Sequence, residues 1–477
     1  MTHPMRTNTS RRSFLGAVSG LAASAIVPSR ALPLATSLAG MAAMATQSSH
    51  AATTGGYKAL VCLYLSGGSD THNWVVPVDA SGYAEYAKAR GELAWGAQQL
   101  QSITAANQGS GRSFGMPLEL APLRDLYEAG QAAIVANVGP LVRPITRAEY
   151  TAGIGIPAKL FSHNDQASTW QSLATEGAPS GWGGRMGDVL MSANANPVFT
   201  AVSASGNAVF LAGNQVSQYQ VGQEGPVVVN AMNGSTLFGS SSASMALKRA
   251  YSASATDRIQ QEYARVMQRS QAANSILQTA LAGVNVPAIP STAIAQVNAG
   301  PTTLDKLSLA RQLRMVMQMI AANQALGMRR QVFMVQMGGF DTHNGQMRDQ
   351  PTQMAQVAQS IGYFMSALTA LGLQNNVTLF TASDFGRTLL SNGDGSDHGW
   401  GSHHFVVGGA VKGRQIAGQF PNTALGTAND IGSGRLLPSL GVTQMASSLA
   451  SWMGLSSSEQ QIVLPNLANF EAGPTLF

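Results

Sequence analysis

Cysteine, charge and long apolar runs are all scarce in this sequence. Among 477 residues Cys62 is the one cysteine, which excludes an internal disulfide framework. Charged residues make up 11% and apolar residues 45%, so a sizeable core is expected and an intrinsically disordered chain is excluded. The apolar run at residues 14–27 is too short to span a bilayer, and we expect no transmembrane segment in the mature chain.

Positive charge is concentrated at the N-terminus. The net charge is +5, and residues 1–51 supply four arginines and no acid, which leaves +1 for the rest of the chain. No basic stripe with interleaved aromatic residues is present in that remainder. A near-neutral body of this kind excludes nucleic acid as the expected partner.

The segment SRRSFL, residues 10–15, has the pattern of a twin-arginine export signal. It predicts that residues 1–51 are a leader recognised by the twin-arginine translocon, which delivers the folded protein to the periplasm or the medium. Small residues allow cleavage after Ala31 or after Ala51, and the later site is favoured because the folded pattern begins near Tyr57. An ordinary secretory leader or an uncleaved anchor is the alternative.

Apolar runs alternate with helical patterns through most of the remaining chain, residues 52–477. Strands are expected at 58–65, 132–138, 331–337, 376–381 and 404–410. Helices are expected at 118–129, 165–172 (with Asp165 as a cap), 255–281, 304–326, 352–371 and 443–453. This alternation predicts an α/β fold with a mainly parallel, doubly wound sheet flanked by helices. Residues 192–303 are rich in Ser, Ala, Asn, Gly and Val, and we interpret them as an inserted cap subdomain.

Three of the expected strands are followed by an aspartate. Asp70 follows the strand at 58–65, Asp341 follows 331–337, and Asp384 follows 376–381. Ligands of open α/β sheets bind at the carboxyl ends of the strands. Three carboxylates at one sheet edge repel one another unless a cation or protons neutralise them.

Histidines accompany these aspartates. The chain after the leader has six of them, in predicted loops or at the start of a strand and none on a predicted helix: His72, His163, His343, His398, His403 and His404. Aspartate and histidine together suit Zn²⁺, Mn²⁺ or Fe better than Mg²⁺ alone. A single aspartate after a strand is more often a cap or turn residue, and a single histidine is more often structural, but the joint pattern predicts a metal site.

Four segments resemble the exported bacterial family called domain of unknown function 1501, which is grouped with the alkaline phosphatase superfamily. They are YKALVCLYLSGGSDTHN, FSHNDQASTW, GGFDTHNGQ and TASDFGRTLLSNGDGSDHGWGSHHFVVGGAVKG. The family has no established activity. The resemblance implies an alkaline phosphatase-like fold that holds one or two divalent ions, Zn²⁺ or Mn²⁺ in the first place.

The resemblance also implies a set of ligands. Asp70 matches the first metal-binding aspartate of the superfamily, and Asp341 with His343 resembles its Asp/His pair on the other metal. His398 lies just before a late strand, as the last histidine ligand of the superfamily does. Asp384 resembles the aspartate of an Asp-His pair, but Phe385 follows it where the superfamily has histidine.

Since Phe385 stands where the superfamily has a histidine, another histidine of the chain is expected to replace the missing one. We expect His403 or His404, or with less support His163, to lie beside Asp384. Neighbouring residues of a strand face opposite sides, so His403 and His404 cannot both point at one site.

By the same resemblance Ser162 is the expected nucleophile, deprotonated by a metal ion. Arg387 is expected to bind the oxygens of the substrate, with a surface salt bridge or a place at a helix start as the alternative. Hydrolysis of a phosphate or sulfate ester, of a small molecule or a polymer, is the implied activity. One alternative is a non-catalytic envelope protein for binding or assembly that keeps the fold with a degraded site. Another is phosphomutase or carbohydrate sulfatase chemistry at the same site.

Two further motifs carry no function. Asp384-Phe385-Gly386 spells a kinase motif, but no glycine-rich loop, strand lysine or His-Arg-Asp loop accompanies it. Residues 392–397 resemble a calcium loop without the closing glutamate, and we interpret them as a turn.

Overall fold

The structure is a computed structural model that describes residues 56–227, 234–252, 257–294 and 302–477. The chain divides into two units, residues 1–51 and residues 52–477. The predicted twin-arginine leader lies outside the described residues. None of the helices in the described ranges combines the length and apolarity that crossing a bilayer requires.

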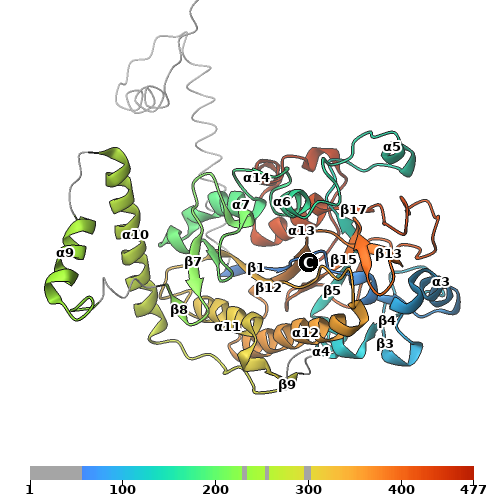
Figure 1. Cartoon of the computed structure of the whole chain (residues 1–477), viewed down its shortest axis with the longest axis horizontal. Helices are drawn as coiled ribbons and strands as arrows, with labels where there is room; N and C mark the ends of the chain where they lie inside the picture. The colour runs from blue at the N-terminus through green and yellow to red at the C-terminus, as the bar shows by residue number, and fades with distance from the viewer. Residues whose placement is uncertain (1–55, 228–233, 253–256, 295–301) are drawn as a thin grey trace, which may run out of the picture. The chain divides into compact units, whose positions relative to one another are not determined.

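A mainly parallel sheet organises the second unit (Figure 1). At its centre β1 (Lys58–Leu65) lies between β12 (Val377–Ser383) and β11 (Arg330–Met337), and both pairings are parallel. Beyond β11 the sheet continues with β6 (Ala201–Ser203), β7 (Tyr219–Gly222) and β8 (Gly225–Pro226). On the other side β15 (Ser402–Val407) runs antiparallel between β12 and β5 (Ala132–Gly139), and β16 (Ile416–Ala417) and β17 (Leu440–Gly441) pair with β5.

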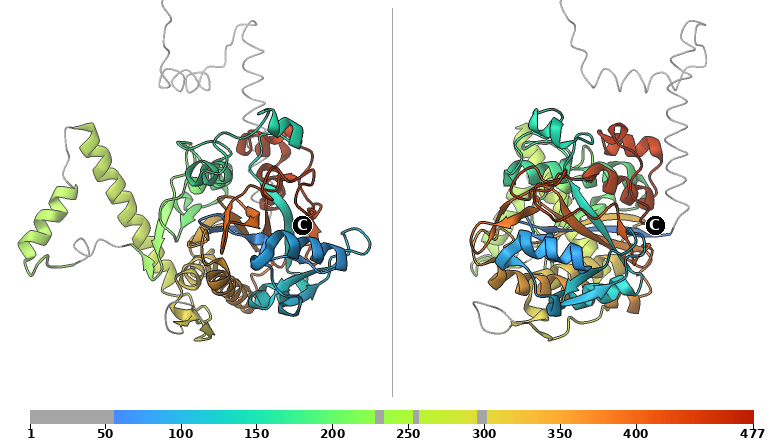
Figure 2. Two further views of the ribbon diagram at one scale, coloured as in Figure 1. Left: turned by 45° about the vertical axis from the view of Figure 1, so that its right-hand side comes forward. Right: turned by 90° about the vertical axis from the view of Figure 1, so that its right-hand side faces the viewer.

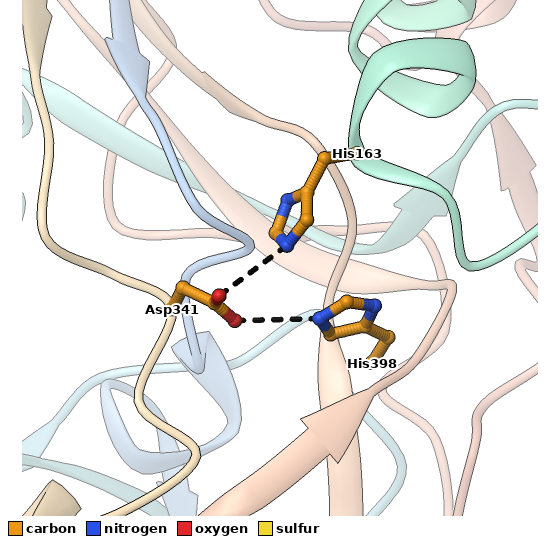
Figure 3. Close-up of side chains that lie close together, drawn as sticks. All are labelled: His163, Asp341 and His398. Carbon is orange, nitrogen blue, oxygen red and sulfur yellow. Dashed lines mark hydrogen bonds and ion pairs between the residues drawn. The ribbon is translucent and has the colours of Figure 1, made fainter.

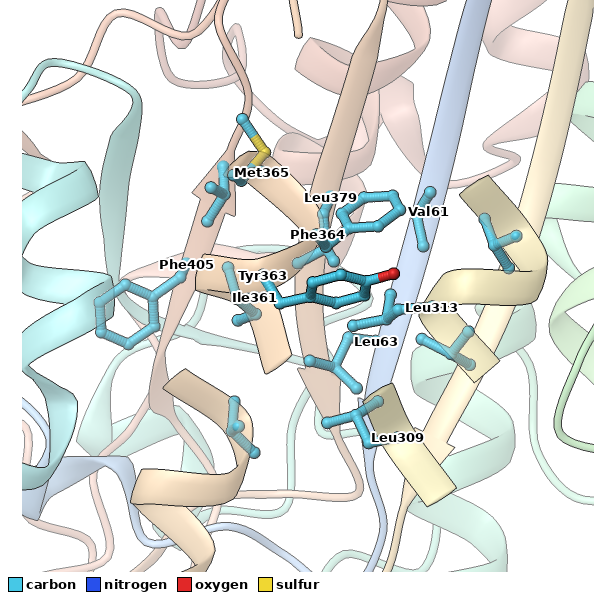
Figure 4. Packing of buried hydrophobic residues seen from close by; sticks show 14 of the residues in the cluster. Val61, Leu63, Leu309, Leu313, Ile361, Tyr363, Phe364, Met365, Leu379 and Phe405 are labelled. Atoms are coloured by element: carbon cyan, nitrogen blue, oxygen red, sulfur yellow. The ribbon is translucent and has the colours of Figure 1, made fainter. Parts of the chain in front are cut away.

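Helices cover both faces of this sheet, as Figures 1 and 2 show. One face packs against α4 (Ala121–Glu128), α11 (Ser308–Ala321) and α12 (Gln346–Ala370), and the other against α7 (Trp182–Leu190), α13 (Val442–Met453) and α14 (Ser457–Val463). Alternate residues of β1 enter the two cores, because side chains of a strand point to opposite faces. Val61 and Leu63 pack against α11 and α12 (Figure 4), whereas Cys62 belongs to the opposite core.

The remaining strands and α-helices complete the unit. They are β2 (Val76–Pro77), α3 (Ala80–Arg90), β3 (Leu100–Ile103), β4 (Phe114–Pro117), α5 (Arg147–Thr151), α6 (His163–Ser172), α9 (Ser241–Ser252), α10 (Arg258–Leu281), β9 (Ala293–Ile294), β10 (Thr302–Thr303), β13 (Arg387–Ser391) and β14 (Ser396–His398). The α/β class and the five predicted strands are confirmed, with shifted ends.

Three differences from the sequence expectations matter for the site. Helix α12 begins at Gln346, ahead of Pro351, because Gln346 and Gln350 of its first turns hydrogen-bond Asp70. Strand β15 begins at Ser402, so it already contains His403 and His404. The segment 192–303 contributes β6, β7 and β8 to the central sheet, which makes the expected insertion narrower than those bounds.

The carboxyl ends of the three central strands meet at one edge of the sheet. Leu65, the last residue of β1, pairs with Met337 of β11 and with Ser383 of β12. The loops that carry Asp70, Asp341 and Asp384 therefore leave the sheet side by side. The hairpin formed by β13 and β14 follows β12 at the same edge and pairs Arg387 with His398.

Candidate metal centre

Three side chains from three separate elements converge at this edge (Figure 3). His163 is the first residue of α6, Asp341 follows β11, and His398 is the last residue of β14. Their ligand atoms all lie within 4.8 Å of one another. The Asp341 carboxylate is central, with Oδ2 3.5 Å from His163 Nε2 and Oδ1 3.3 Å from His398 Nε2. No sequence segment contains two of the three residues.

Both imidazoles turn the same nitrogen toward Asp341. His163 Nδ1 lies 2.7 Å from Asp384 Oδ2, and His398 Nδ1 lies 2.7 Å from the carbonyl oxygen of Phe161. Each of these oxygens accepts a hydrogen bond, so we assign the ring proton to Nδ1 in both histidines. The lone pair of each Nε2 is then directed into the space beside Asp341, as in a histidine that binds a metal.

His343 adds a third imidazole whose Nε2 also faces Asp341. Its Nε2 lies 3.1 Å from Asp341 Oδ1 and 2.9 Å from His398 Nε2, while its Nδ1 lies 3.3 Å from Asp397 Oδ1. Two imidazole lone pairs at 2.9 Å repel each other unless a proton or a cation lies between them. The crowding of nitrogen atoms around one carboxylate favours a bound cation.

The surroundings of these three groups shift their pKa values in different directions. The hydrogen bond with Asp384 raises the pKa of His163, against the opposing effect of burial. Burial lowers the pKa of His398, and His163 and Arg387 lower it further. Burial alone would raise the pKa of Asp341, but the hydrogen bond and charge of Arg387 outweigh it and hold that pKa below its usual value. Asp341 is therefore an anion and His398 a neutral donor at neutral pH.

Arg387 contacts Asp341 from the protein interior. Its side chain is completely buried, and its NH1 donates to Asp341 Oδ1 at 2.8 Å and to the Gly67 carbonyl at 3.2 Å. The Nε and NH2 groups donate to the Ser396 carbonyl. The predicted role of Arg387 in binding substrate oxygens is corrected by this burial, because its donors are used inside the protein. Arg387 orients the carboxylate of Asp341 from a buried position in β13, which differs from the surface salt bridge or helix-start position expected as its alternative.

The carboxylate of Asp70 pairs with an arginine side chain. Its buried carboxylate forms an ion pair with Arg90 NH2 and accepts a hydrogen bond from Gln346 Nε2. Arg90 also donates to the carbonyl of Thr388 at 2.9 Å and to Asn73 Oδ1 at 3.2 Å. The structure does not bring Asp70 into the convergent group, and the guanidinium of Arg90 neutralises its carboxylate. Its predicted role as a ligand is corrected accordingly.

Asp384 lies behind a histidine of the group. Its Oδ2 accepts hydrogen bonds from His163 Nδ1 and, at 3.2 Å, from the amide of Gly67. Its Oδ1 is buried without a hydrogen-bond partner. Burial raises the pKa of Tyr64, and the nearby charge of Asp384 raises it further, so the tyrosine stays neutral beside the carboxylate. This geometry suits orientation of His163 better than direct metal ligation.

His163 therefore takes the position beside Asp384 for which His403 and His404 had more support. The ring of His163 lies 4.8 Å from that of Phe385, the residue that stands where a histidine was expected. His403 Nδ1 accepts a hydrogen bond from the amide of Asn137 at 3.1 Å, and its ring stacks on Phe420.

His404 serves the interior on the other side of the strand. Its Nε2 lies 2.8 Å from Ser402 Oγ, and its ring lies 4.7 Å from that of Trp170. The two histidines thus face opposite sides of the sheet, as the strand geometry predicted. Both are buried with lowered pKa values, and neither belongs to the convergent group. Their predicted role as ligands is corrected, because β15 begins early enough to carry both into the core.

Ser162 precedes His163 at the N-terminus of α6. Its Oγ donates a hydrogen bond to Asp165 Oδ2 at 2.9 Å, and Asp165 Oδ1 lies 3.5 Å from Lys159 Nζ. Ser162, rather than Asp165, occupies the residue position before the helix. A nucleophilic role for Ser162 stays a prediction, now with Asp165 as the group that accepts its proton.

The sequence reasoning missed three residues of this region. Asp397 was assigned to a turn, yet it accepts from His343 as well as from Asn392 Nδ2 at 2.8 Å. Its position directly before His398 was the available signal. The turn itself is confirmed, since residues 391 and 396 pair across the β13–β14 hairpin. Arg90 and Asp165 carried no comparable signal, because their partners are set by packing or by the helix start.

A family model described as "Protein of unknown function (DUF1501)" matches residues 57–457. Similar solved structures include a sulfatase from Pseudoalteromonas sp. (TM-score 0.33, 11% identity, 88% of this chain and 74% of that chain) and the lipoteichoic acid synthase of Listeria monocytogenes (0.32, 8%, 89% and 81%). An alkaline phosphatase variant is similar at a TM-score of 0.29 and 12% identity, over 70% of this chain and 64% of that chain. No match was found among the curated proteins.

Proposed function

This chain belongs to the family of proteins of unknown function called DUF1501, and we propose that it is a metal-dependent hydrolase of phosphate or sulfate esters. The observation that carries the proposal is the shared orientation of three imidazoles around Asp341. His163, His343 and His398 each have Nδ1 near an oxygen acceptor and Nε2 near the Asp341 carboxylate. An arrangement that leaves three nitrogen lone pairs facing one anion suits a bound cation.

The donor set fits Zn²⁺ or Mn²⁺. His163, Asp341 and His398 would hold the ion, and His343 is next in reach. A bound divalent ion supplies Lewis acidity toward an ester oxygen and lowers the pKa of water. Asp341 and His343 have side chains that are 44% and 40% exposed, so a substrate can reach the centre from solvent. A second ion at Asp70 is disfavoured, because Arg90 already neutralises that carboxylate.

The chain's own residues supply the remaining functions. Asp384, Asp397 and the Phe161 carbonyl fix the orientation of the three imidazoles. Arg387 keeps Asp341 ionised and oriented. Ser162 is the candidate nucleophile, and its hydrogen bond to Asp165 provides an acceptor for the hydroxyl proton.

Elemental analysis of the purified protein tests the metal, and a panel of aryl phosphate monoesters, diesters and sulfates tests the reaction. We expect about one equivalent of metal and turnover that a chelator abolishes and Zn²⁺ or Mn²⁺ restores. Asp341→Ala and His398→Ala should each reduce occupancy at least tenfold. The matched control is Asp125→Ala, which removes an exposed carboxylate paired with Arg124. Less than a tenth of an equivalent of metal, with no gain on addition of either ion, would refute the proposal.

A non-catalytic binding or assembly role is the second candidate. The ion pair of Asp70 with Arg90 favours it, because it leaves fewer anionic groups for catalysis at this edge. A protein that binds metal stoichiometrically but turns over no ester in the panel would support this candidate over the hydrolase.

We also propose that the protein acts outside the cytoplasm. The support is the twin-arginine pattern at residues 10–15. Replacement of Arg11 and Arg12 by lysine should retain the protein in the cytoplasm, as measured by cell fractionation. Export of that variant at the wild-type level would contradict the proposal.

A further inference from the structure

Helix α10 has an apolar face that is buried at one end and exposed at the other. Ala273, Leu277 and Ala280 on its C-terminal half pack into the core that contains α11 and α12. Ile259 and Val266 lie on the same face at helical spacing, and their side chains are 80% and 48% exposed. A soluble helix ordinarily turns such a face to the core, whereas the described residues leave these two side chains largely uncovered.

Exposed apolar residues are concentrated around α9 and α10. Of the fifteen large hydrophobic residues that are exposed in the described chain, seven lie between residues 227 and 276. Phe238, in the turn before α9, is 98% exposed and adopts a positive φ of 50°. Phe238 and Tyr263 are the two aromatic residues among the fifteen. Exposed aromatic and aliphatic groups gathered over so short a segment mark an interaction surface.

The charge of the same segment is opposite to that of the remaining body. Helices α9 and α10 with the cap of α10 carry five basic residues and two acidic residues, a net charge of +3: Lys248, Arg249, Arg258, Arg265 and Arg269, with Asp257 and Glu262. Residues after 51 total +1, so the rest of the body is −2. Arg258, Arg265 and Arg269 are spaced by seven and four residues and line one edge of the apolar face. Glu262 pairs with two of them.

We propose that this surface, formed by Phe238 and the exposed apolar and basic residues of α9 and α10 (labelled in Figure 1), docks the protein on an anionic lipid bilayer. An amphipathic helix with arginines beside its apolar face inserts that face among the acyl chains while the guanidinium groups reach the headgroups. An aromatic side chain at an exposed turn is suited to the interface between headgroups and acyl chains. The negative remainder of the body would be repelled by the same bilayer, which orients the protein.

Flotation with lipid vesicles tests the inference. The full-length chain and a chain that begins at residue 52 are each mixed with vesicles of phosphatidylcholine alone or with 30% phosphatidylglycerol. The second chain is included because the leader itself has four arginines and an apolar run. We expect the chain from residue 52 to float with the anionic vesicles, and 0.5 M salt to reduce the bound fraction at least fivefold. Equal flotation with both vesicle types, or none with either, would overturn the proposal.

Variants distinguish binding through this surface from nonspecific adsorption to the vesicles. The triple variant Phe238→Ser, Ile259→Gln, Val266→Gln should reduce binding to anionic vesicles at least tenfold, and Arg265→Gln with Arg269→Gln should reduce it at least threefold. The matched control is Ile462→Gln, which removes an apolar side chain that is 68% exposed elsewhere on the body. It should bind as the wild type does.

Light scattering of the same proteins distinguishes a second copy of the chain as the occupant. If the wild type is a dimer in the absence of lipid and the triple variant is a monomer, the surface is a self-association interface and the proposal fails. Metal content should be unchanged in every variant, because no residue of the centre at Asp341 is altered. Failure of vesicle binding is therefore distinguishable from failure of the proposed hydrolase function.

Discussion

His163 Nδ1 lies 2.7 Å from Asp384 Oδ2, across 221 residues of sequence. This contact joins the start of α6 to the end of β12 and turns His163 Nε2 toward Asp341. The carboxylate thus selects the tautomer of an imidazole on the neighbouring element. His398 and His343 are oriented in the same way by the Phe161 carbonyl and by Asp397.

Removal of this orienting carboxylate should weaken metal binding without removing a ligand. For Asp384→Asn we expect metal affinity to fall about 10- to 100-fold, the usual effect of losing such a partner of a ligating histidine. Titration calorimetry of the metal-free protein measures the affinity. Asp125→Asn, at an exposed carboxylate, should leave it unchanged. Unaltered affinity in Asp384→Asn would mean that His163 is not a ligand or is oriented by other groups.

The buried pair of Asp70 and Arg90 makes a separate prediction about stability. Arg90→Met leaves Asp70 charged and buried, and we expect the free energy of unfolding to fall by about 3–5 kcal/mol. The double variant Asp70→Leu, Arg90→Met should recover most of that loss, because no unpaired charge stays in the interior. Urea denaturation measures both. A loss below 1 kcal/mol in the single variant would show that the pair is solvated or replaced by other contacts.

The buried histidines predict a loss of stability in acid. Burial lowers the pKa of His72 and of His404 to about 3, and burial also lowers that of His403 well below 6.5. The unfolded chain takes up a proton at each histidine as the pH falls below about 6.5, whereas the folded protein keeps His72 and His404 neutral until near pH 3 and keeps His403 neutral well below pH 6.5. The contribution of these neutral histidines to the free energy of unfolding is therefore intact above pH 6.5. It is lost, at about 1.4 kcal/mol per histidine per pH unit, as the pH falls.

A single substitution isolates one of these histidines. His404→Gln removes one titrating group, and the free energy of unfolding should then fall less steeply between pH 6 and pH 4, by about 1.4 kcal/mol per pH unit. Urea denaturation across that range gives the slope. Ile462→Gln, which changes an exposed apolar residue, should keep the wild-type slope. Identical slopes in His404→Gln and the wild type would contradict a neutral buried imidazole.

Ser162 and Asp165 make a prediction about turnover. If Ser162 is the nucleophile, Ser162→Ala should lower kcat at least a thousandfold with metal content unchanged. Asp165→Asn should lower kcat about 10²- to 10⁴-fold, because it removes the acceptor of the hydroxyl proton. Steady-state rates on the best ester of the panel, at fixed metal content, give both values. Full activity of Ser162→Ala would assign the attack to water.

Much of the fold could be predicted from local patterns. The apolar run at 58–65 and its counterparts at 331–337 and 376–381 gave three parallel central strands, since a strand buried on both faces is apolar along its length. The placement of Asp341 and Asp384 at one sheet edge followed from the strands being parallel. The start of α12 was missed. Long-range hydrogen bonds of Gln346 and Gln350 extend this helix toward its N-terminus, to residues before Pro351.

The expected positions of the histidines agree with the structure only in part. The pairing of His398 with Asp341 agrees with the residues expected at the site, whereas the locations of His403 and His404 do not. Strand β15 begins at Ser402, two residues before the expected start at residue 404, so His403 as well as His404 lies within the strand, where side chains alternate between the two buried faces. No local pattern fixes such a boundary.

The sequence by itself determined the α/β class, the edge of the sheet where aspartates gather and the type of donor present there, because strand burial and residue chemistry are local properties. Tertiary structure alone decided which donors meet. Helix α6 brings His163 to Asp384, and Arg90 pairs with Asp70. Those choices depend on the packing of segments more than two hundred residues apart or on the reach of a long side chain, and neither is encoded in spacing along the chain.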